Sequence, residues 1–141
     1  MADNLFNPGR EGFLAAEIDW NGATIKVALV RGYTFSASHK FMSDVTSNGG
    51  TLVATATLTN PVVTNGIADA DDVVFSAVPT GAACNALIIY QSSAVGGGAD
   101  VASNLQRLIA DIRDASGLPV TPNGGNINVT WDNGSNKIFN L

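Results

Sequence analysis

The stretch Thr24–Val30, Thr-Ile-Lys-Val-Ala-Leu-Val, gives the clearest indication of the fold. Its side chains alternate between two sides of an extended chain, and one side carries Ile25, Val27 and Leu29. This period of two predicts a β-strand with an apolar face in the core. Thr51–Leu58 repeats the alternation, with β-branched residues on its second face, and is predicted to be another strand.

Further strands are predicted outward from this pair. Ala86–Gln91 is apolar on both faces, which indicates a central strand covered on both sides. Three more candidate strands are Val73–Val78, Asn126–Asp132 and Lys137–Leu141. Turn sequences rich in glycine, asparagine and proline separate these segments. About seven or eight short strands therefore predict an all-β protein with a single β-sandwich, either immunoglobulin-like or jelly-roll-like.

One segment fits two kinds of element. Leu105–Arg113 carries apolar residues at a helical spacing, but alternate residues from Leu108 would also suit a strand. The helical period is the stronger local signal, whereas the surrounding strands favour β-structure, and we predict a strand. The preceding Ser92–Ser103 contains three consecutive glycines and is predicted to be a flexible loop or a hairpin tip.

The N-terminal residues form a different kind of segment. Asn7 followed by Pro8 is typical of a helix start, and a short helix is predicted within residues 4–18. Gly9 and Gly12 weaken it, so the helix must dock either on its own domain or on a neighbour. We therefore divide the chain into an arm, residues 1–22, and a sandwich domain, residues 23–141. The predicted interface residues of the arm are Leu5, Phe6, Phe13, Leu14 and Ile18.

Composition excludes several classes of protein. The 141 residues suit one domain, and the formal net charge of -5 argues against a free-standing nucleic-acid binder. No apolar run is long enough to span a bilayer, so no membrane partner is expected. The first residues lack the pattern of a secretory signal, and we expect the chain to fold in a reducing cytoplasm.

The chain has few residues of the types that catalyse reactions or bind metals. Its single cysteine, Cys84, and single histidine, His39, exclude an internal disulfide and a paired-histidine metal site. Cys84 is interpreted as a small buried apolar residue and His39 as a surface or turn residue. The acidic run Asp69–Asp72 is interpreted as a turn in preference to a calcium site. We predict no catalytic, cofactor-binding or metal-binding residues, and therefore no enzyme.

The order of these motifs resembles a family of small structural proteins of tailed bacteriophages. The resemblance rests on Thr24–Val30, Ser43–Val45, Ala68–Val73 with Phe75, Ala86–Tyr90, Gly117–Gly125, Ile127–Gly134 and Ile138–Leu141. It covers most of the chain and also favours a strand at Leu108–Ile112. Gly96–Arg107 departs from the pattern, because related chains often have a short loop there.

The resemblance implies a part in the virion but leaves that part open. We expect a capsid cement, or decoration, protein that forms a homotrimer and binds the major capsid protein over joints between its subunits. It would be made in the host cytoplasm and end on the capsid surface. A neck, tail or fibre component is the first alternative. The second is a small sugar-binding or hydrolytic domain that uses an exposed Trp20 and the acidic residues.

Overall fold

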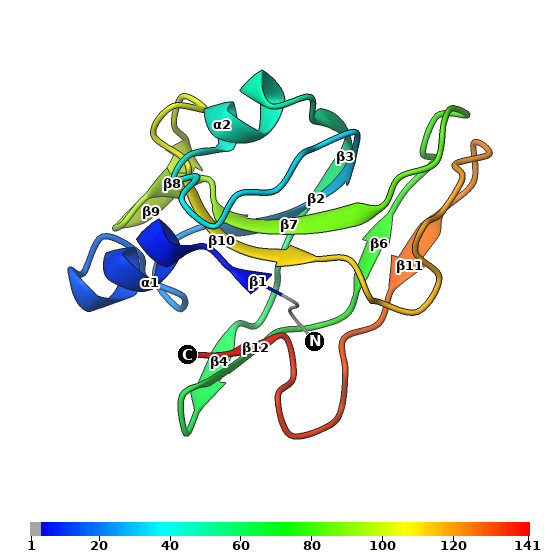
Figure 1. The fold of residues 1–141 in the computed structure, drawn as a ribbon. Coiled ribbons are helices and arrows are strands. Elements are labelled where there is room, and N and C mark those ends of the chain that lie inside the picture. The colour runs from blue at the N-terminus through cyan, green and yellow to red at the C-terminus, as the bar shows by residue number, and fades with distance from the viewer. Residues whose placement is uncertain (1–3) are drawn as a thin grey trace.

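A computed structural model describes residues 4–141, which form an all-β fold with short helices (Figure 1). Its centre is a five-stranded antiparallel sheet with the order β1-β10-β7-β2-β3. These strands are β1 (Asn4–Leu5), β10 (Arg107–Ile112), β7 (Ala86–Gln91), β2 (Ile25–Arg31) and β3 (Thr51–Thr57). The predicted sandwich-like β-fold with an N-terminal helix is confirmed, although residues 4–141 contain twelve strands because several are only two or three residues long.

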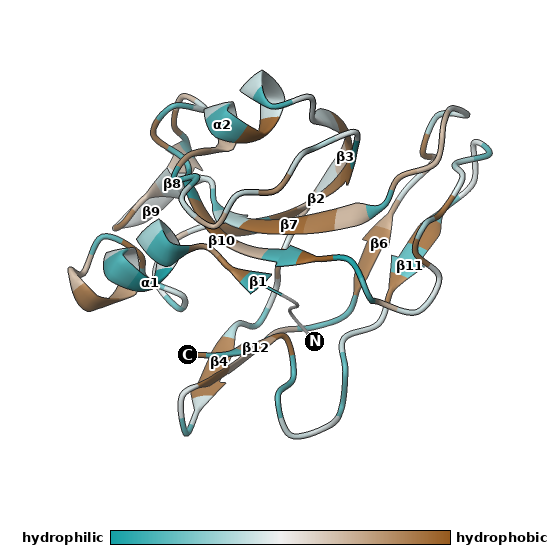
Figure 2. Ribbon diagram, in the orientation of Figure 1, coloured by the Kyte–Doolittle hydropathy of each residue, from teal (hydrophilic) through white to brown (hydrophobic). Residues whose placement is uncertain are grey.

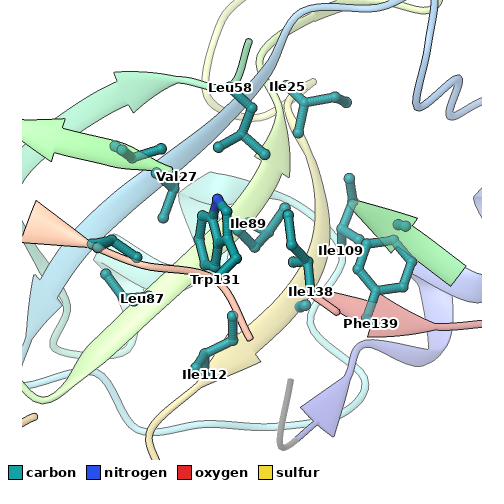
Figure 3. Packing of buried hydrophobic residues seen from close by; sticks show 14 of the residues in the cluster. Ile25, Val27, Leu58, Leu87, Ile89, Ile109, Ile112, Trp131, Ile138 and Phe139 are labelled. Carbon is teal, nitrogen blue, oxygen red and sulfur yellow. The ribbon is translucent and has the colours of Figure 1, made fainter. Parts of the chain in front are cut away.

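Two small sheets form the second layer. The first has the order β11-β6 and the second the order β12-β5-β4. Their strands are β11 (Ile127–Val129), β6 (Val73–Phe75), β12 (Phe139–Asn140), β5 (Ile67–Asp69) and β4 (Val62–Thr64). The main core lies between this layer and the central sheet, where Trp131 and Phe139 meet side chains such as Ile89 (Figure 3). Burial of these large apolar groups is the main stabilising contribution to the fold.

The opposite face of the central sheet is covered by other segments. Ile88 and Leu108 point to that side, where they form a second core cluster with Phe6, Met42 and Val45. Met42 and Val45 belong to the helix α2 (Met42–Ser47). All six residues of β7 are buried, which confirms the prediction of a central strand covered on both faces.

Helix α2 was not predicted. It follows the segment Tyr33–Lys40, which forms neither a helix nor a strand. The carboxylate of Asp44 accepts hydrogen bonds from the backbone N–H groups of Lys40 at 2.8 Å and Phe41 at 2.9 Å. These bonds hold the start of the helix, and they lower the pKa of Asp44 against the opposing effect of its burial.

The ambiguous and glycine-rich segments both form β-structure. The ambiguous segment becomes β10, so the predicted strand is confirmed. The glycine-rich segment forms a hairpin of β8 (Ser93–Ala94) and β9 (Gly97–Asp100), one of its two predicted forms. Lys26 on β2 pairs with Asp100 at 2.6 Å, and this hydrogen-bonded partner lowers the pKa of Asp100. The hairpin is therefore tied to the central sheet.

Candidate interaction surface

The N-terminal segment packs on its own chain. Its first strand, β1, pairs with β10, and the helix α1 (Asn7–Leu14) lies beside the same strand. A Cβ atom on Gly9 would lie 2.6 Å from the carbonyl oxygen of Leu108. The glycines that weaken the helix in sequence therefore allow its backbone to approach the sheet closely. Residues 4–22 are consequently part of the same folded unit as the rest of the described chain.

Two buried polar side chains fasten this segment. Arg107 forms an ion pair with Glu17 and donates a hydrogen bond to the carbonyl oxygen of Pro8 at 2.6 Å. Gln91 accepts a hydrogen bond from the N–H of Asp19 and donates one to the carbonyl of Glu17, both at 3.0 Å. Because these bonds join both ends of α1 to neighbouring strands, the helix is held in one orientation.

The predicted interface residues have different environments. Phe6 and Ile18 are buried in their own chain, with exposed fractions of 0% and 4%, so the prediction that they face a partner is wrong for this fold. The central sheet supplies the apolar surface that a short arm lacks by itself. Leu5 is half-buried, and Phe13 is half-buried with its ring 5.9 Å from that of Phe139. Leu14 is 87% exposed.

Leu14 stands at the exposed end of α1. We call Leu14–Ala16 the helix tip, and all three of its residues are exposed. Ala16 has a φ of 59°, and the next N–H, that of Glu17, donates to the carbonyl of Gly12 at 2.8 Å. This bond, together with that from Ala16 N–H to Phe13 at 3.4 Å, forms a Schellman-type helix end. The helix tip is an apolar projection with a fixed backbone.

A second apolar surface lies on the three-stranded sheet. Val62 and Val63 on β4 are 51% and 53% exposed, and Asn65-Gly66 forms the turn that leads into β5. Among residues 4–141, β4 pairs only with β5, so no described strand lies beside its other edge. Figure 2 shows the apolar character of this projecting hairpin. An unpaired edge with apolar side chains is suited to pairing with another chain.

A pocket of about 460 Å³ lies at the other end of the second layer. Leu29 and Leu87 of the central sheet are among its lining residues, although both are almost fully buried, with exposed fractions of 0% and 2%. The other lining residues are the run 126–130, which contains β11, and the segment 115–118 with Val120. None of the lining residues is charged. Since five consecutive residues line it, the pocket is a groove that follows β11.

The single histidine and cysteine both have structural partners. The Nδ1 atom of His39 lies 2.7 Å from the hydroxyl of Tyr33. Burial raises the pKa of Tyr33 to about 12, so this hydroxyl is neutral at physiological pH. Cys84 is fully buried, its pKa is raised by that burial, and its backbone pairs with Val120. The thiol therefore has the environment predicted for a small core residue, remote from solvent.

The acidic run holds the two tryptophans. The indole N–H of Trp20 donates to the carbonyl of Asp69 at 3.2 Å, and that of Trp131 donates to the carbonyl of Asp71 at 2.9 Å. Asp72 accepts from the backbone N–H of Trp131 at 2.9 Å. The run therefore has a structural role, but it is an irregular link between β5 and β6 and not the predicted turn. Trp20 is only 4% exposed, which contradicts the exposed Trp20 of the sugar-binding alternative.

Within residues 4–141, no group of three or more histidine, cysteine, aspartate or glutamate side chains is placed to hold a metal ion. Neither α1 nor α2 has the length and apolar character needed to cross a membrane.

Comparison with protein-family models, with curated proteins and with solved structures found no match. Functional inference for this chain therefore rests on its own sequence and geometry.

Proposed function

We propose that this protein is a bacteriophage capsid cement protein that binds the major capsid protein over joints between its subunits and stabilises the head. The observation that carries the proposal is the helix tip, where a rigid β-core presents Leu14 with 87% of its surface exposed. The resemblance of the sequence to small virion proteins supports the same role. The surface therefore suits binding by contact, with an apolar anchor on a fixed support.

The fixed support matters because ordering a flexible segment on binding costs free energy. Arg107 and Gln91 already hold α1 in place, so this cost is small when the helix tip meets a partner. A stable protein contact buries about 1,200–2,000 Å² in total, which requires neighbouring surface as well as Leu14. Repetition of the contact over a capsid then resists the opening of subunit joints.

Copy number in purified virions tests the role. The protein would be quantified against the major capsid protein by mass spectrometry. A cement protein is expected at a lattice-sized fraction, such as a ratio near one to one. A handful of copies per particle would overturn the proposal in favour of a neck, tail or fibre component. Absence from virions would overturn any structural role in the particle.

A point variant tests the surface. Leu14→Asp should weaken binding to capsids by about 30-fold or more, because a charge replaces an apolar side chain that becomes buried in the complex. Leu105→Asp is the matched control, since Leu105 is also exposed and lies between β9 and β10, outside α1. Equal capsid binding by the two variants would contradict the assignment. Deletion of the arm is unsuitable because it removes Phe6 and Ile18 from the core.

A further inference from the structure

Five asparagines of this chain precede a glycine, and this sequence can lose the side-chain amide without an enzyme. The backbone nitrogen of the glycine attacks the Cγ atom of the asparagine, ammonia leaves, and a succinimide ring forms. Glycine favours the reaction because it has no Cβ atom and leaves the backbone free to rotate. The five asparagines are Asn21, Asn48, Asn65, Asn123 and Asn133.

Exposure does not distinguish these sites, because all five asparagines are exposed. They differ in the hydrogen bonds of the reacting atoms. The attacking nitrogen of Gly22 donates its N–H to Oδ1 of Asp19 at 3.0 Å, and that of Gly134 donates to Oδ1 of Asp132 at 2.9 Å. Either nitrogen reaches the Cγ atom of its asparagine only if the peptide plane rotates and breaks this bond. Reaction at these two sites therefore costs a hydrogen bond.

Two further sites are restrained in other ways. The N–H of Gly124 donates to the carbonyl of Val78 at 2.8 Å, so the same cost applies at Asn123. At Asn48 the group under attack is held instead, because its side-chain amide donates to the carbonyl of Asp44 at 2.7 Å. The backbone N–H of Asn48 donates to the same carbonyl at 3.1 Å. Reaction at Asn48 therefore requires the end of α2 to open.

Asn65 has neither restraint. Within residues 4–141, the Asn65 side chain and the N–H of Gly66 form no hydrogen bond. The two residues make the tight turn between β4 and β5, with φ angles of 54° and 79°. The carbonyl of Gly66 accepts a bond from the N–H of Leu141 at 2.9 Å, which does not involve the attacking nitrogen. β4 projects from the molecule and is exposed throughout, so opening of this turn costs little (Figure 1).

We propose that Asn65 deamidates spontaneously and reacts fastest of the five, because the fold leaves its reacting atoms free. The nitrogen of Gly66 forms a bond to Cγ of Asn65, and the Cγ–Nδ2 bond breaks. The proton lost from the Gly66 amide leaves with the ammonia. Water then adds to one of the two ring carbonyls and breaks the bond from that carbon to the ring nitrogen. Opening at the side-chain carbonyl gives aspartate, and opening at the main-chain carbonyl gives isoaspartate.

Both products change the end of this hairpin. Each places a negative charge in the segment 59–68, which has no charged residue. Isoaspartate also lengthens the main chain by one carbon between Thr64 and Ile67, which are paired across the turn. Because the turn fixes the register of a hairpin, this extra atom disrupts the pairing of β4 with β5. The exposed edge of β4 is therefore altered as the protein ages, independently of the capsid role.

Peptide mapping by tandem mass spectrometry tests the ranking. The folded protein is incubated at mildly alkaline pH, and conversion of amide to carboxyl is followed at each site. Asn65 should react about 2- to 10-fold faster than each other site, which is the factor expected for one hydrogen bond. In concentrated urea the rates should converge, because glycine follows all five asparagines. An equal or lower rate at Asn65 in the folded protein would overturn the proposal, and so would the same ranking in urea.

A variant at a restrained site tests the physical reason. Asp132→Ala removes the acceptor of the Gly134 N–H and should speed deamidation of Asn133 by about 2- to 10-fold. Asp132 is exposed, so this substitution spares the core, and the rate at Asn65 serves as the internal reference. An unchanged rate at Asn133 would overturn the explanation by hydrogen bonding.

Ageing of a matched variant tests the effect on the hairpin. Asn65→Gly lacks the reactive amide and keeps the turn, because glycine adopts positive φ readily. Hydrogen exchange in residues 62–69 should increase on ageing in the wild type and stay constant in Asn65→Gly. An equal increase in both proteins would overturn the assignment to Asn65.

Discussion

Gly9 and Gly12 face inward from α1, where a larger residue would have no room. From the sequence, both are expected to weaken the helix, because glycine costs about 1 kcal/mol against alanine in a helix interior. The structure adds a second effect that propensity does not contain. At Gly9 the neighbouring atom is a backbone oxygen of β10, which a side-chain rotation cannot move aside.

Gly9→Ala therefore should destabilise the protein by about 1–3 kcal/mol despite the better helix propensity of alanine. The physical reason is the 2.6 Å separation between the new Cβ and the oxygen of Leu108. Urea unfolding measures the effect. Gly96→Ala is the control and should change the free energy of unfolding little, because nothing lies within 4 Å of a Cβ there. Equal stability of the two variants would contradict the close packing of α1.

At Ala16, by contrast, a residue with a Cβ occupies a position where glycine would fit better. Its φ of 59° is in the left-handed region, which glycine adopts more easily than any residue with a Cβ. Ala16→Gly should therefore raise the free energy of unfolding by about 0.5–1 kcal/mol at this helix end. Chemical denaturation compared with the wild type checks this value. A loss of stability would mean that the Cβ of Ala16 makes a contact worth more than its strain.

At the scale of elements, Gln91 decides where the N-terminal segment lies. Its amide bridges the Asp19 N–H and the Glu17 carbonyl, and its side chain is buried at the end of β7. Buried polar side chains are rare unless they are fully hydrogen-bonded. The sequence around Gln91 reads simply as the end of an apolar strand, so this role could not be predicted from it.

Gln91→Leu should destabilise the protein by about 1–3 kcal/mol, because the Asp19 N–H and the Glu17 carbonyl, which are partly buried, both lose their hydrogen-bond partner. Hydrogen exchange should increase mainly in residues 7–20, since this segment loses its tether. An increase spread evenly over all strands would instead indicate general destabilisation and contradict the tether. Asn126→Leu is a control: Asn126 also accepts a backbone hydrogen bond, but it is exposed and at the far end of the second layer.

Strand β10 shows why local periodicity misleads here. The helical spacing of Leu105, Leu108, Ile109 and Ile112 is real, yet every residue from Arg107 to Ile112 is buried. A strand between β1 and β7, covered on both faces, needs apolar residues at nearly every position. Such a run contains a helical stripe by chance. Pairing with neighbouring strands, rather than the pattern itself, decides the structure.

Both tyrosines of the chain are buried in the folded molecule. Tyr33 lies on one face of the central sheet beside His39, and Tyr90 belongs to β7. Burial raises both pKa values from 10 to about 12, because a phenolate is poorly solvated in the interior. In the unfolded chain both hydroxyls titrate near 10. The free energy of unfolding at alkaline pH therefore depends on the ionisation of these two hydroxyls.

The free energy of unfolding should fall as pH rises from about 10 to 12. In this window the unfolded chain releases its tyrosine protons while the folded chain retains them, so unfolding becomes more favourable. Absorbance at alkaline pH should show tyrosine ionisation near 12 in the native protein and near 10 in denaturant. Because the chain has two tyrosines, Tyr33→Phe should halve the signal. A native titration near 10 would contradict the burial of both hydroxyls.

The amino-acid sequence was sufficient to predict the β-class and the central strands, because a strand buried on one face alternates apolar and polar residues and a strand buried on both faces is apolar throughout. It also determined the low chemical content of the chain, through its single histidine and cysteine. It did not locate α2, β1 or the groove, since these depend on contacts between residues distant in the chain. The burial of Phe6 and Ile18 and the exposure of Leu14 could be seen only in the folded structure. All three are apolar residues of one short segment. They differ in exposure because of how the segment packs on the central sheet, and most of that sheet is formed by residues outside the segment.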